Sequence, residues 1–392
     1  MAGHLTSGYL VRRPGWAARG ALMLAGFAFA AGAWCAESGV GADTLLLGQS
    51  AALSGPAAAL GTEMREGALA YFQQVNAGGG VNGRKIELRS HDDGYEPDRA
   101  AANTRKLIET DRVFALFGYV GTPTSQASLP IVSAAKVPFF GAFTGAELLR
   151  DPFNRYVFNV RASYFDETEK MVNHLVTGGK KNIAVLFQND SFGQAGLTGV
   201  ENAMRRRNLK ISGVGTVERN TTDVAAAVKS IGAAKPDAVI MISAYRSCAE
   251  FVRQAKKAGI ASDYFNVSFV GAKALASDLG ADGYGVMIAQ VVPFPWAPNI
   301  PVVKEYQRAM AKSNPQSALS FTSLEGFVAA KVFVEGLRRG GRELTRDKLI
   351  AGLESLRDFD AGGFSVTFGP GNHNGSKFVD LTMIAKDGKF IH

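Results

Sequence analysis

The chain has 392 residues, of which 46% are hydrophobic and 20% are charged. This length allows two or three domains of ordinary size with sizeable cores, and the hydrophobic content excludes an intrinsically disordered chain. The formal net charge is +8 at pH 7. Basic residues are interspersed with acidic ones rather than gathered in one stripe, so we expect no nucleic-acid partner.

The first 42 residues are predicted to be an export signal and leader. Arginines within residues 12–19 precede a short apolar run at residues 21–31 and then small residues, which is the order of regions in a secretory signal. The apolar run is shorter than the roughly 20 residues that cross a bilayer. Cleavage after Ala33 or after Ala42 fits this interpretation, and the sequence does not choose between them. We expect an exported protein located in the periplasm.

The two cysteines, Cys35 and Cys248, bear on anchoring and on disulfides. Cys35 would carry the lipid in a lipoprotein, but Trp34 occupies the preceding position, where processing favours a small residue. We therefore expect no lipid anchor. Removal of the leader would leave Cys248 as the only thiol, which excludes an internal disulfide. We expect Cys248 to be a small buried residue on a helix.

From residue 43 onward, short apolar runs alternate with helix-like segments. In the segment 61–75, apolar residues recur at helical spacing, so one face of this helix is apolar. The predicted strands of this first set are 44–48, 85–90, 113–118 and 137–141, and the predicted helices are 61–75, 97–111 and one ending at Ala135.

The same alternation restarts after residue 161. The predicted strands are 183–188, 210–217, 238–243, 265–271 and 286–291, and the predicted helices are 193–207, 224–234 and 249–259. Several of these runs are apolar throughout, which is typical of a parallel sheet covered by helices on both faces. Two β–α sets that divide near residues 158–165 predict an α/β protein with two doubly wound parallel-sheet lobes.

A proline-rich connection at residues 293–298 leads into the last part of the chain. Helices are predicted at 301–313, 320–338 and 345–356, and strands at 364–368 and 378–385. Helices that follow two complete sets indicate that the chain crosses back. We expect one lobe from residues 43–162 plus about 290–358 and the other from 163–289 plus about 359–392, joined by a hinge of several strands. A cleft between two lobes is a favoured ligand site.

Motifs for catalysis are absent from the sequence. It contains no Gly-x-Ser-x-Gly nucleophile motif and no Gly-x-x-x-x-Gly-Lys-Ser/Thr phosphate loop. The five histidines form no His-x-x-x-His pair, and one remaining cysteine cannot build a zinc site. His91, Asp92 and Asp93 are consecutive, but adjacent strand residues point to opposite faces. These three side chains could therefore not all bind one metal ion unless the strand ended there. We therefore expect binding rather than catalysis, with no catalytic residue, metal or cofactor.

Three loops bring backbone and hydroxyl groups to the ends of strands: residues 53–61, 118–126 and 140–145. A helix N-terminus offers free N–H groups and a partial positive charge, which favour a carboxylate. Thr122 and Thr144 would add hydroxyl groups at the carboxyl edge of neighbouring strands, where open α/β sheets bind ligands. The alternative is that these hydroxyls only cap helices.

Residues 51–61, 67–72, 75–86, 189–193 and 251–259 resemble the branched-chain amino-acid (Leu/Ile/Val-binding) type of periplasmic substrate-binding proteins. The resemblance covers essentially the whole chain after the leader. It implies the type I periplasmic binding fold, a small-molecule ligand, and delivery of that ligand to the membrane permease of an ABC importer. We expect a monomer.

The resemblance also implies site residues. In relatives, the loops that match Gly121, Thr122, Ala142, Phe143 and Thr144 hold the ligand carboxylate, and positions that match Leu60, Phe192 and Tyr245 line the pocket. For Leu60 and Phe192, ordinary packing is the alternative. The predicted ligand-binding residues are Ser54, Leu60, Tyr119, Gly121, Thr122, Ala142, Phe143, Thr144, Phe192, Tyr245 and Ser268.

One position departs from the amino-acid binders. These relatives place an acidic residue after the strand that matches 265–270, where it neutralises the ligand ammonium, and this chain has Ser268 there. A buried ammonium without a counter-charge is costly. We predict a ligand that bears a carboxylate or amide and need not carry an α-ammonium, such as an aliphatic or aromatic acid. The alternative is that Glu250 supplies the acid. Apolar walls are expected from Phe143, Phe192, Tyr245 and Phe269.

The predicted mechanism is hinge closure over the bound solute. Contacts from Phe192, Tyr245 and Ser268 would form only when the lobes meet. Two other classes remain: a ligand-sensing domain of a receptor or of a cytoplasmic amide sensor with the same fold, and a secreted enzyme. The leader argues against a cytoplasmic sensor, and the sequence has no second apolar run long enough for a receptor.

Overall fold

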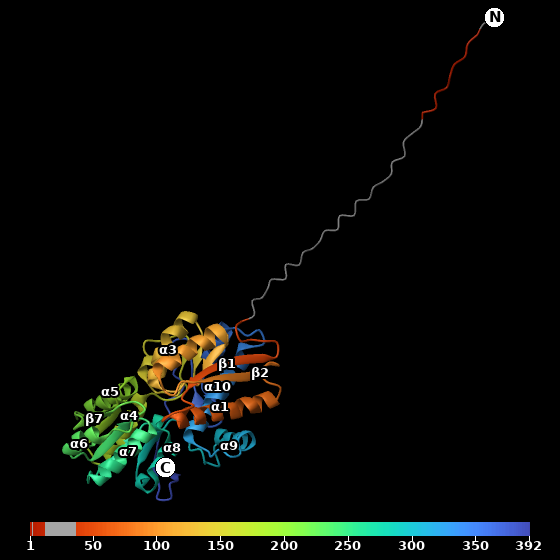
Figure 1. The fold of residues 1–392 in the computed structure, drawn as a ribbon. Helices are drawn as coiled ribbons and strands as arrows, with labels where there is room; N and C mark the ends of the chain where they lie inside the picture. The colour runs from red at the N-terminus through yellow and green to blue at the C-terminus, as the bar shows by residue number, and fades with distance from the viewer. Residues whose placement is uncertain (2, 12–36) are drawn as a thin grey trace. The chain divides into compact units, whose positions relative to one another are not determined.

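The computed structural model describes residues 1, 3–11 and 37–392 (Figure 1). The chain divides into two units, residues 1–35 and 36–392, and every helix and strand below belongs to the second unit. Most of the predicted export signal, with Cys35, lies outside the described residues. Within the described part of the chain, no helix has the length and apolar character needed to cross a membrane.

The first sheet has five parallel strands in the order β2-β1-β3-β4-β5. Its strands are β1 (Thr44–Ala51), β2 (Lys85–Asp92), β3 (Ala115–Phe117), β4 (Phe139–Phe140) and β5 (Val157–Phe158). Its helices are α1 (Ala58–Ala77), α2 (Pro97–Arg105), which continues as the π-helix η1 (Lys106–Thr110), and α3 (Thr122–Ala135). The four strands predicted from the first set of apolar runs are confirmed, with β3 and β4 shorter than expected.

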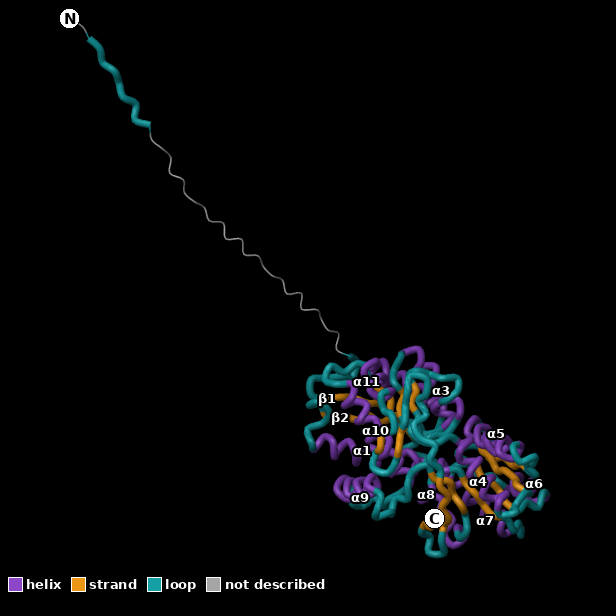
Figure 2. Tube along the Cα trace, turned by 180° about the vertical axis from the view of Figure 1, so that it is seen from behind, coloured by secondary structure: helices purple, strands orange, loops and turns teal. Residues whose placement is uncertain are grey.

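The second sheet has seven strands in the order β14-β13-β10-β9-β8-β6-β7. The parallel strands are β6 (Ile183–Gln188), β7 (Val214–Val217), β8 (Ala238–Ile242), β9 (Asp263–Asn266) and β10 (Met287–Gln290). The antiparallel edge strands are β13 (Asp380–Ile384) and β14 (Phe390–Ile391). The associated helices are α4 (Tyr164–Thr177), α5 (Ser191–Arg205), α6 (Ala225–Ala233), α7 (Tyr245–Lys257) and α8 (Ala272–Leu279). Strands of this sheet lie among α4–α7 (Figure 2).

The last three helices pack with the elements of the first sheet. They are α9 (Pro301–Ser313), α10 (Phe321–Gly340) and α11 (Arg346–Glu354). Helix α10 lies beside α1 (Figure 1), where Tyr71 packs edge-on against Phe327 with ring centroids 5.0 Å apart. Gly67 permits this close approach, because a Cβ there would lie 1.7 Å from the carbonyl oxygen of Ser323.

We call the first sheet with α1–α3 and α9–α11 the first lobe, and the second sheet with α4–α8 the second lobe. The chain passes between them after β5, after β10 and before β13, which confirms a hinge of several segments. A two-stranded sheet, β11 (Phe359–Asp360) with β12 (Ser365–Val366), precedes the last passage. Phe368, which the sequence assigned to the second lobe, packs on Phe140 and Phe158 of the first, with centroids 6.4 and 5.3 Å away.

Some elements differ from the prediction. The predicted strand 265–271 ends at Asn266, because residues 268–270 form the 3-10 turn η3 (Ser268–Val270). Helices α4 and α8 were not expected. Helix α4 begins with a capping box, in which Ser163 accepts from the Asp166 N–H and Asp166 accepts from the Ser163 N–H. This Ser-x-x-Asp pattern is a helix-start signal that the sequence reading missed.

Residues 37–42, which we assigned to the leader, pack onto the first lobe. The Arg346 N–H donates to Glu37 Oε2 at 3.1 Å, and the Leu46 N–H donates to the Gly39 carbonyl at 2.8 Å. Cleavage after Ala33 would keep these contacts, whereas cleavage after Ala42 would remove them.

Candidate ligand-binding site between the lobes

The loop after β3 is shaped by a glycine and ends at a helix N-terminus. Gly121 has a φ of 102°, a conformation that favours glycine, and a Cβ there would lie 2.2 Å from Tyr95 Cε2. Tyr95 therefore lies directly against this loop. Helix α3 starts at Thr122, and no side chain caps it. Its first backbone N–H groups are therefore available to a ligand.

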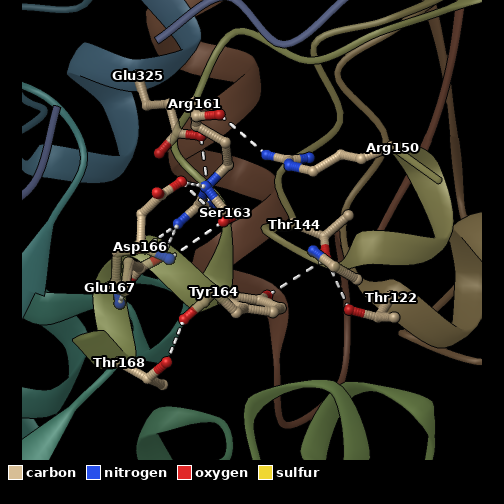
Figure 3. A network of polar contacts seen from close by, with 12 residues as sticks. Thr122, Thr144, Arg150, Arg161, Ser163, Tyr164, Asp166, Glu167, Thr168 and Glu325 are labelled. Atoms are coloured by element: carbon tan, nitrogen blue, oxygen red, sulfur yellow. Dashed lines mark hydrogen bonds and ion pairs between the residues drawn. The ribbon is translucent and has the colours of Figure 1, made fainter. Parts of the chain in front are cut away.

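The loop after β4 meets the loop after β3. Thr122 Oγ1 and Thr144 Oγ1 are 2.6 Å apart, and both threonines are fully buried (Figure 3). Thr144 Oγ1 also donates to the hydroxyl of Tyr164 at 3.3 Å and accepts from the Ala146 N–H at 3.3 Å. The Phe143 N–H holds the two loops together by donating to the Tyr119 carbonyl at 2.7 Å. The structure thus brings together the two predicted threonines.

Aromatic side chains from both lobes surround the threonines. Phe269 of η3 lies 4.6 Å from Phe192, 5.3 Å from Phe143 and 5.8 Å from Tyr95, measured between ring centroids. Tyr164 lies 5.4 Å from Phe192. We call these five residues the aromatic cluster. Phe192 is held at the start of α5, where Asp190 accepts its backbone N–H at 3.0 Å.

Leu60 and Tyr245 meet at a second contact between the lobes. The Ala59 N–H donates to the Tyr245 hydroxyl at 3.5 Å. Leu60 packs against the backbone of Gly271, because a Cβ on Gly271 would lie 2.5 Å from Leu60 Cδ2. These contacts join the start of α1 to α7 and η3.

Three other predicted residues have different places. The side chain of Tyr119 packs on Phe139 with centroids 4.8 Å apart, and its hydroxyl contacts Thr104 Oγ1 at 3.0 Å, so it belongs to the core between α2 and α3 rather than to the site. Ser54 is exposed and donates its hydroxyl to Asp92 at 2.5 Å. Ala142 contributes its carbonyl, which accepts from the Thr144 N–H at 2.9 Å.

Ser268 lies in a group of buried charges that the sequence reading missed. Its N–H donates to Glu167 Oε2 at 2.7 Å, and its hydroxyl donates to Glu167 Oε1 at 2.9 Å. Arg161 Nη2 donates to the Ser268 hydroxyl and to Glu167 Oε1, the latter at 3.1 Å, and Arg161 Nη1 lies 3.4 Å from Glu325 Oε1 (Figure 3). Arg161, Glu167 and Glu325 form what we call the charged cluster. Their side chains are 1%, 0% and 6% exposed.

The electrostatics of the charged cluster favour a protonated Arg161. Burial opposes its charge, but Glu325 and Glu167 outweigh burial and raise the pKa of Arg161 above its ordinary value. Burial raises the pKa of Glu325 to about 7, with repulsion from Glu167 adding to it and attraction by Arg161 and Arg150 opposing it. Burial also raises the pKa of Glu167, against the attraction of Arg161.

The segment after β2 connects this site to the second lobe. The Tyr95 hydroxyl accepts from Gln188 Nε2 at 3.3 Å, and Glu96 pairs with Arg219 at 2.9 Å. Asn220 Nδ2 donates to Glu96 Oε1 at 2.8 Å. Tyr95 has a φ of 65°, which is rare for a bulky residue and often marks a functional position. No local pattern announces these pairs, because their members lie about 90 residues or more apart in the chain.

The sequence also singled out Glu250 and Cys248. Glu250, the alternative acid, accepts from Arg253 and Gln254 of its own helix at 2.8 and 2.9 Å, so its carboxylate is already engaged within α7. Cys248 is buried on α7 as expected, and burial raises its pKa. Among the described residues, no group of three or more His, Cys, Asp or Glu side chains is arranged to hold a metal ion.

Comparisons with known proteins agree with this architecture. The family model for Periplasmic binding protein matches residues 44–389. The Leu/Ile/Val-binding protein homolog 7 of Brucella suis biovar 1 is 26% identical over an alignment of 354 residues, and the alignment covers 86% of this chain and 88% of that protein.

Two solved structures resemble the chain. The crystal structure of a possible leucine/isoleucine/valine-binding protein from Rhodopirellula baltica has a TM-score of 0.85 and 39% identity, covering 90% of this chain and 97% of that one. A fatty acid ABC transporter substrate-binding protein from Thermomonospora curvata has a TM-score of 0.81 and 22% identity, covering 91% of this chain and 92% of that one. At that identity the second likeness is one of fold.

Proposed function

Because this chain belongs to the periplasmic binding protein family, we propose that it captures a small carboxylate- or amide-bearing ligand between its two lobes and delivers it to the membrane permease of an ABC importer. The observation that carries this proposal is the meeting of Thr122 and Thr144, with their hydroxyl oxygens 2.6 Å apart, at the uncapped N-terminus of α3.

These threonines are better explained by a ligand than by helix capping. Gly121, not a threonine, occupies the N-cap of α3, and no side chain bonds to its first N–H groups. The two hydroxyls instead contact each other, where both are near the free N–H groups of one helix. A carboxylate placed there would receive hydroxyl and backbone donors together with the partial positive charge of the helix.

The aromatic cluster supports an apolar remainder of the ligand. Phe143 and Tyr95 reach it from the first lobe, and Phe192, Tyr164 and Phe269 from the second. The relatives are named for leucine, isoleucine and valine in one case and for a fatty acid in another. An apolar chain that ends in a carboxylate is the chemistry common to these names. We infer that the ligand is an aliphatic or aromatic acid or a related amide.

Hinge closure follows from the same contacts. The Phe143–Phe269, Ala59–Tyr245 and Glu96–Arg219 contacts join the two lobes and would be lost on opening. A ligand that touches both lobes therefore favours the closed form by its additional contacts there. The relatives are binding proteins of the periplasm, and we propose the same location, a monomeric state and no catalysis for this chain.

A ligand panel with thermal unfolding tests the proposal. The purified protein is heated with leucine, valine, 4-methyl-2-oxopentanoate, phenylacetate, octanoate and their amides, and small molecules extracted from it are identified by mass spectrometry. A ligand at one hundred times its Kd should stabilise the folded protein by about 2.7 kcal/mol. If no member of the panel raises the melting temperature and no such molecule is extracted, the proposed function is wrong.

A further inference from the structure

We propose that Arg161 determines the charge of the ligand: its guanidinium is a built-in cation that favours acids without an α-ammonium over the corresponding amino acids. This inference rests on the proposed function, and it adds a specificity residue that the threonine loops do not contain. Arg161 acts on the ligand through its charge and its free donor, and it lies on the segment that joins the two lobes.

The position of the guanidinium supports this role. Its carbon lies 4.9 Å from the ring centroid of Phe143 and 5.9 Å from that of Tyr164. Its Nη2 donates to the hydroxyl of Ser268. The hydroxyl of Tyr164 in turn accepts from Thr144 at 3.3 Å. Arg161 therefore contacts side chains that lie next to the two threonines.

The carboxylate of Glu167, next to Arg161, is already engaged in hydrogen bonds. Glu167 accepts hydrogen bonds from the Ser268 N–H, the Ser268 hydroxyl and Arg161, so both of its oxygens are used. Glu325 is the second partner of Arg161, and Arg150 adds another positive charge by donating to the Arg161 carbonyl at 2.9 Å. With Glu325 protonated below its pKa of about 7, Arg161 and Glu167 carry one positive and one negative charge. They leave no surplus negative charge to balance a ligand ammonium.

Two nitrogens of Arg161, Nε and Nη1, have no hydrogen-bond partner among the described residues, and Nη1 lies in the ion pair with Glu325. The remaining donor, Nε, is buried. Buried polar groups in proteins nearly always have a partner, so an acceptor on the ligand is a natural one. An oxygen in the 2-position of an acid would accept this hydrogen bond, whereas an ammonium in the same position has only donors and is repelled by the guanidinium.

The decisive comparison uses two ligands of the same shape. Leucine and 4-methyl-2-oxopentanoate share their carbon skeleton and differ in the ammonium and the 2-oxo group. Like charges a few ångströms apart in a buried site predict a Kd for the 2-oxo acid lower by on the order of 10- to 100-fold, measured by calorimetric titration. If the panel identifies another acid, that acid is compared with its 2-amino counterpart. Equal affinities, or tighter binding of the amino acid, would overturn the role of Arg161 while leaving the proposed function intact.

Variants of the charged cluster separate charge from structure. Arg161→Gln removes the cation and frees Glu167, so the ratio of the two Kd values should shift at least about tenfold toward the amino acid. Arg161→Lys keeps the charge and serves as the matched control, with the preference for the acid retained. A ratio that stays unchanged in Arg161→Gln would reject the proposal, because a merely structural role would alter both affinities together.

A third variant covers the case in which Arg161→Gln does not fold. Glu325→Gln keeps Arg161 but removes one carboxylate that balances it, so in titrations at pH 8, above the Glu325 pKa of about 7, the preference for the acid should increase. A shift of this variant toward the amino acid would also reject the proposal. Circular dichroism and thermal unfolding confirm the folded state of each variant before the titrations.

Discussion

Replacing Thr144 by valine tests the carboxylate site with almost no change of shape. The side chain loses one hydroxyl, which contacts Thr122 Oγ1 at 2.6 Å, the Tyr164 hydroxyl at 3.3 Å and the Ala146 N–H at 3.3 Å. A hydrogen bond to a charged acceptor contributes about 1.5–3 kcal/mol. We therefore expect the Kd for the acid identified by the panel to rise about 10- to 150-fold in calorimetric titrations.

Thr104→Val is the matched control. Thr104 is also fully buried in the first lobe, but it lies in the core between α2 and α3 rather than at the proposed site. Its hydroxyl contacts the Ala100 carbonyl at 2.7 Å, Ser128 Oγ at 2.9 Å and the Tyr119 hydroxyl at 3.0 Å. Both variants should lose about 1–3 kcal/mol of unfolding free energy in urea, because each leaves buried polar groups unpaired. Only Thr144→Val should lose affinity. Binding by Thr144→Val within twofold of the wild type would refute the assigned site.

Three further predictions concern stability, closure and processing. The pKa of Glu325 is about 7 in the folded protein and has the ordinary value of 4.5 in the unfolded chain, so between these pH values only the folded state holds the proton. As the pH rises from 4.5 to 7, the free energy of unfolding of the wild type should therefore fall by about 3 kcal/mol relative to that of Glu325→Gln, measured by urea unfolding. Glu96→Gln breaks the partly exposed ion pair with Arg219 across the lobes. The rate constant of ligand release, measured by stopped flow at low salt, should therefore be a few-fold higher in the variant than in the wild type. This difference should shrink at roughly 0.5 M salt, because salt screens the ion pair. The exported protein should begin at Trp34 on N-terminal sequencing, and a form lacking residues 37–42 should melt at a lower temperature, because those residues contact the first lobe.

The alternation of strands and helices was predictable because a buried parallel strand leaves a simple signature in the sequence. The run 183–188 is apolar up to its last residue and forms β6 with the predicted ends. The meeting of Thr122 and Thr144 followed from the same logic, since β3 and β4 are neighbours and their carboxyl ends share one edge. Side-chain direction beyond a strand end was not predictable. Tyr119 follows β3 by two residues, and its side chain turns into the core behind the site.

The charged cluster could not be predicted, because its three members and Ser268 come from four separate places. Arg161 lies on a connecting segment, Glu167 on α4, Ser268 in η3 and Glu325 on α10. The turn η3 was itself hidden, since the apolar residues of 265–271 have the composition of a strand. From the sequence alone, a charged residue is expected at the protein surface. Only the tertiary contacts show that Arg161 is buried with two carboxylates for partners.

These contacts give the proposed exclusion of a ligand ammonium a different reason from the one that the sequence suggested. The sequence argument relied on the absence of an acid at Ser268, yet Glu167 hydrogen-bonds to both the N–H and the hydroxyl of that residue. A carboxylate is therefore present beside Ser268. It cannot serve a ligand, because Arg161 already shares its charge. The charge that a buried site accepts thus depends on the balance of all its ionised groups, and a single cation at Arg161 reverses what the nearby carboxylate alone would favour.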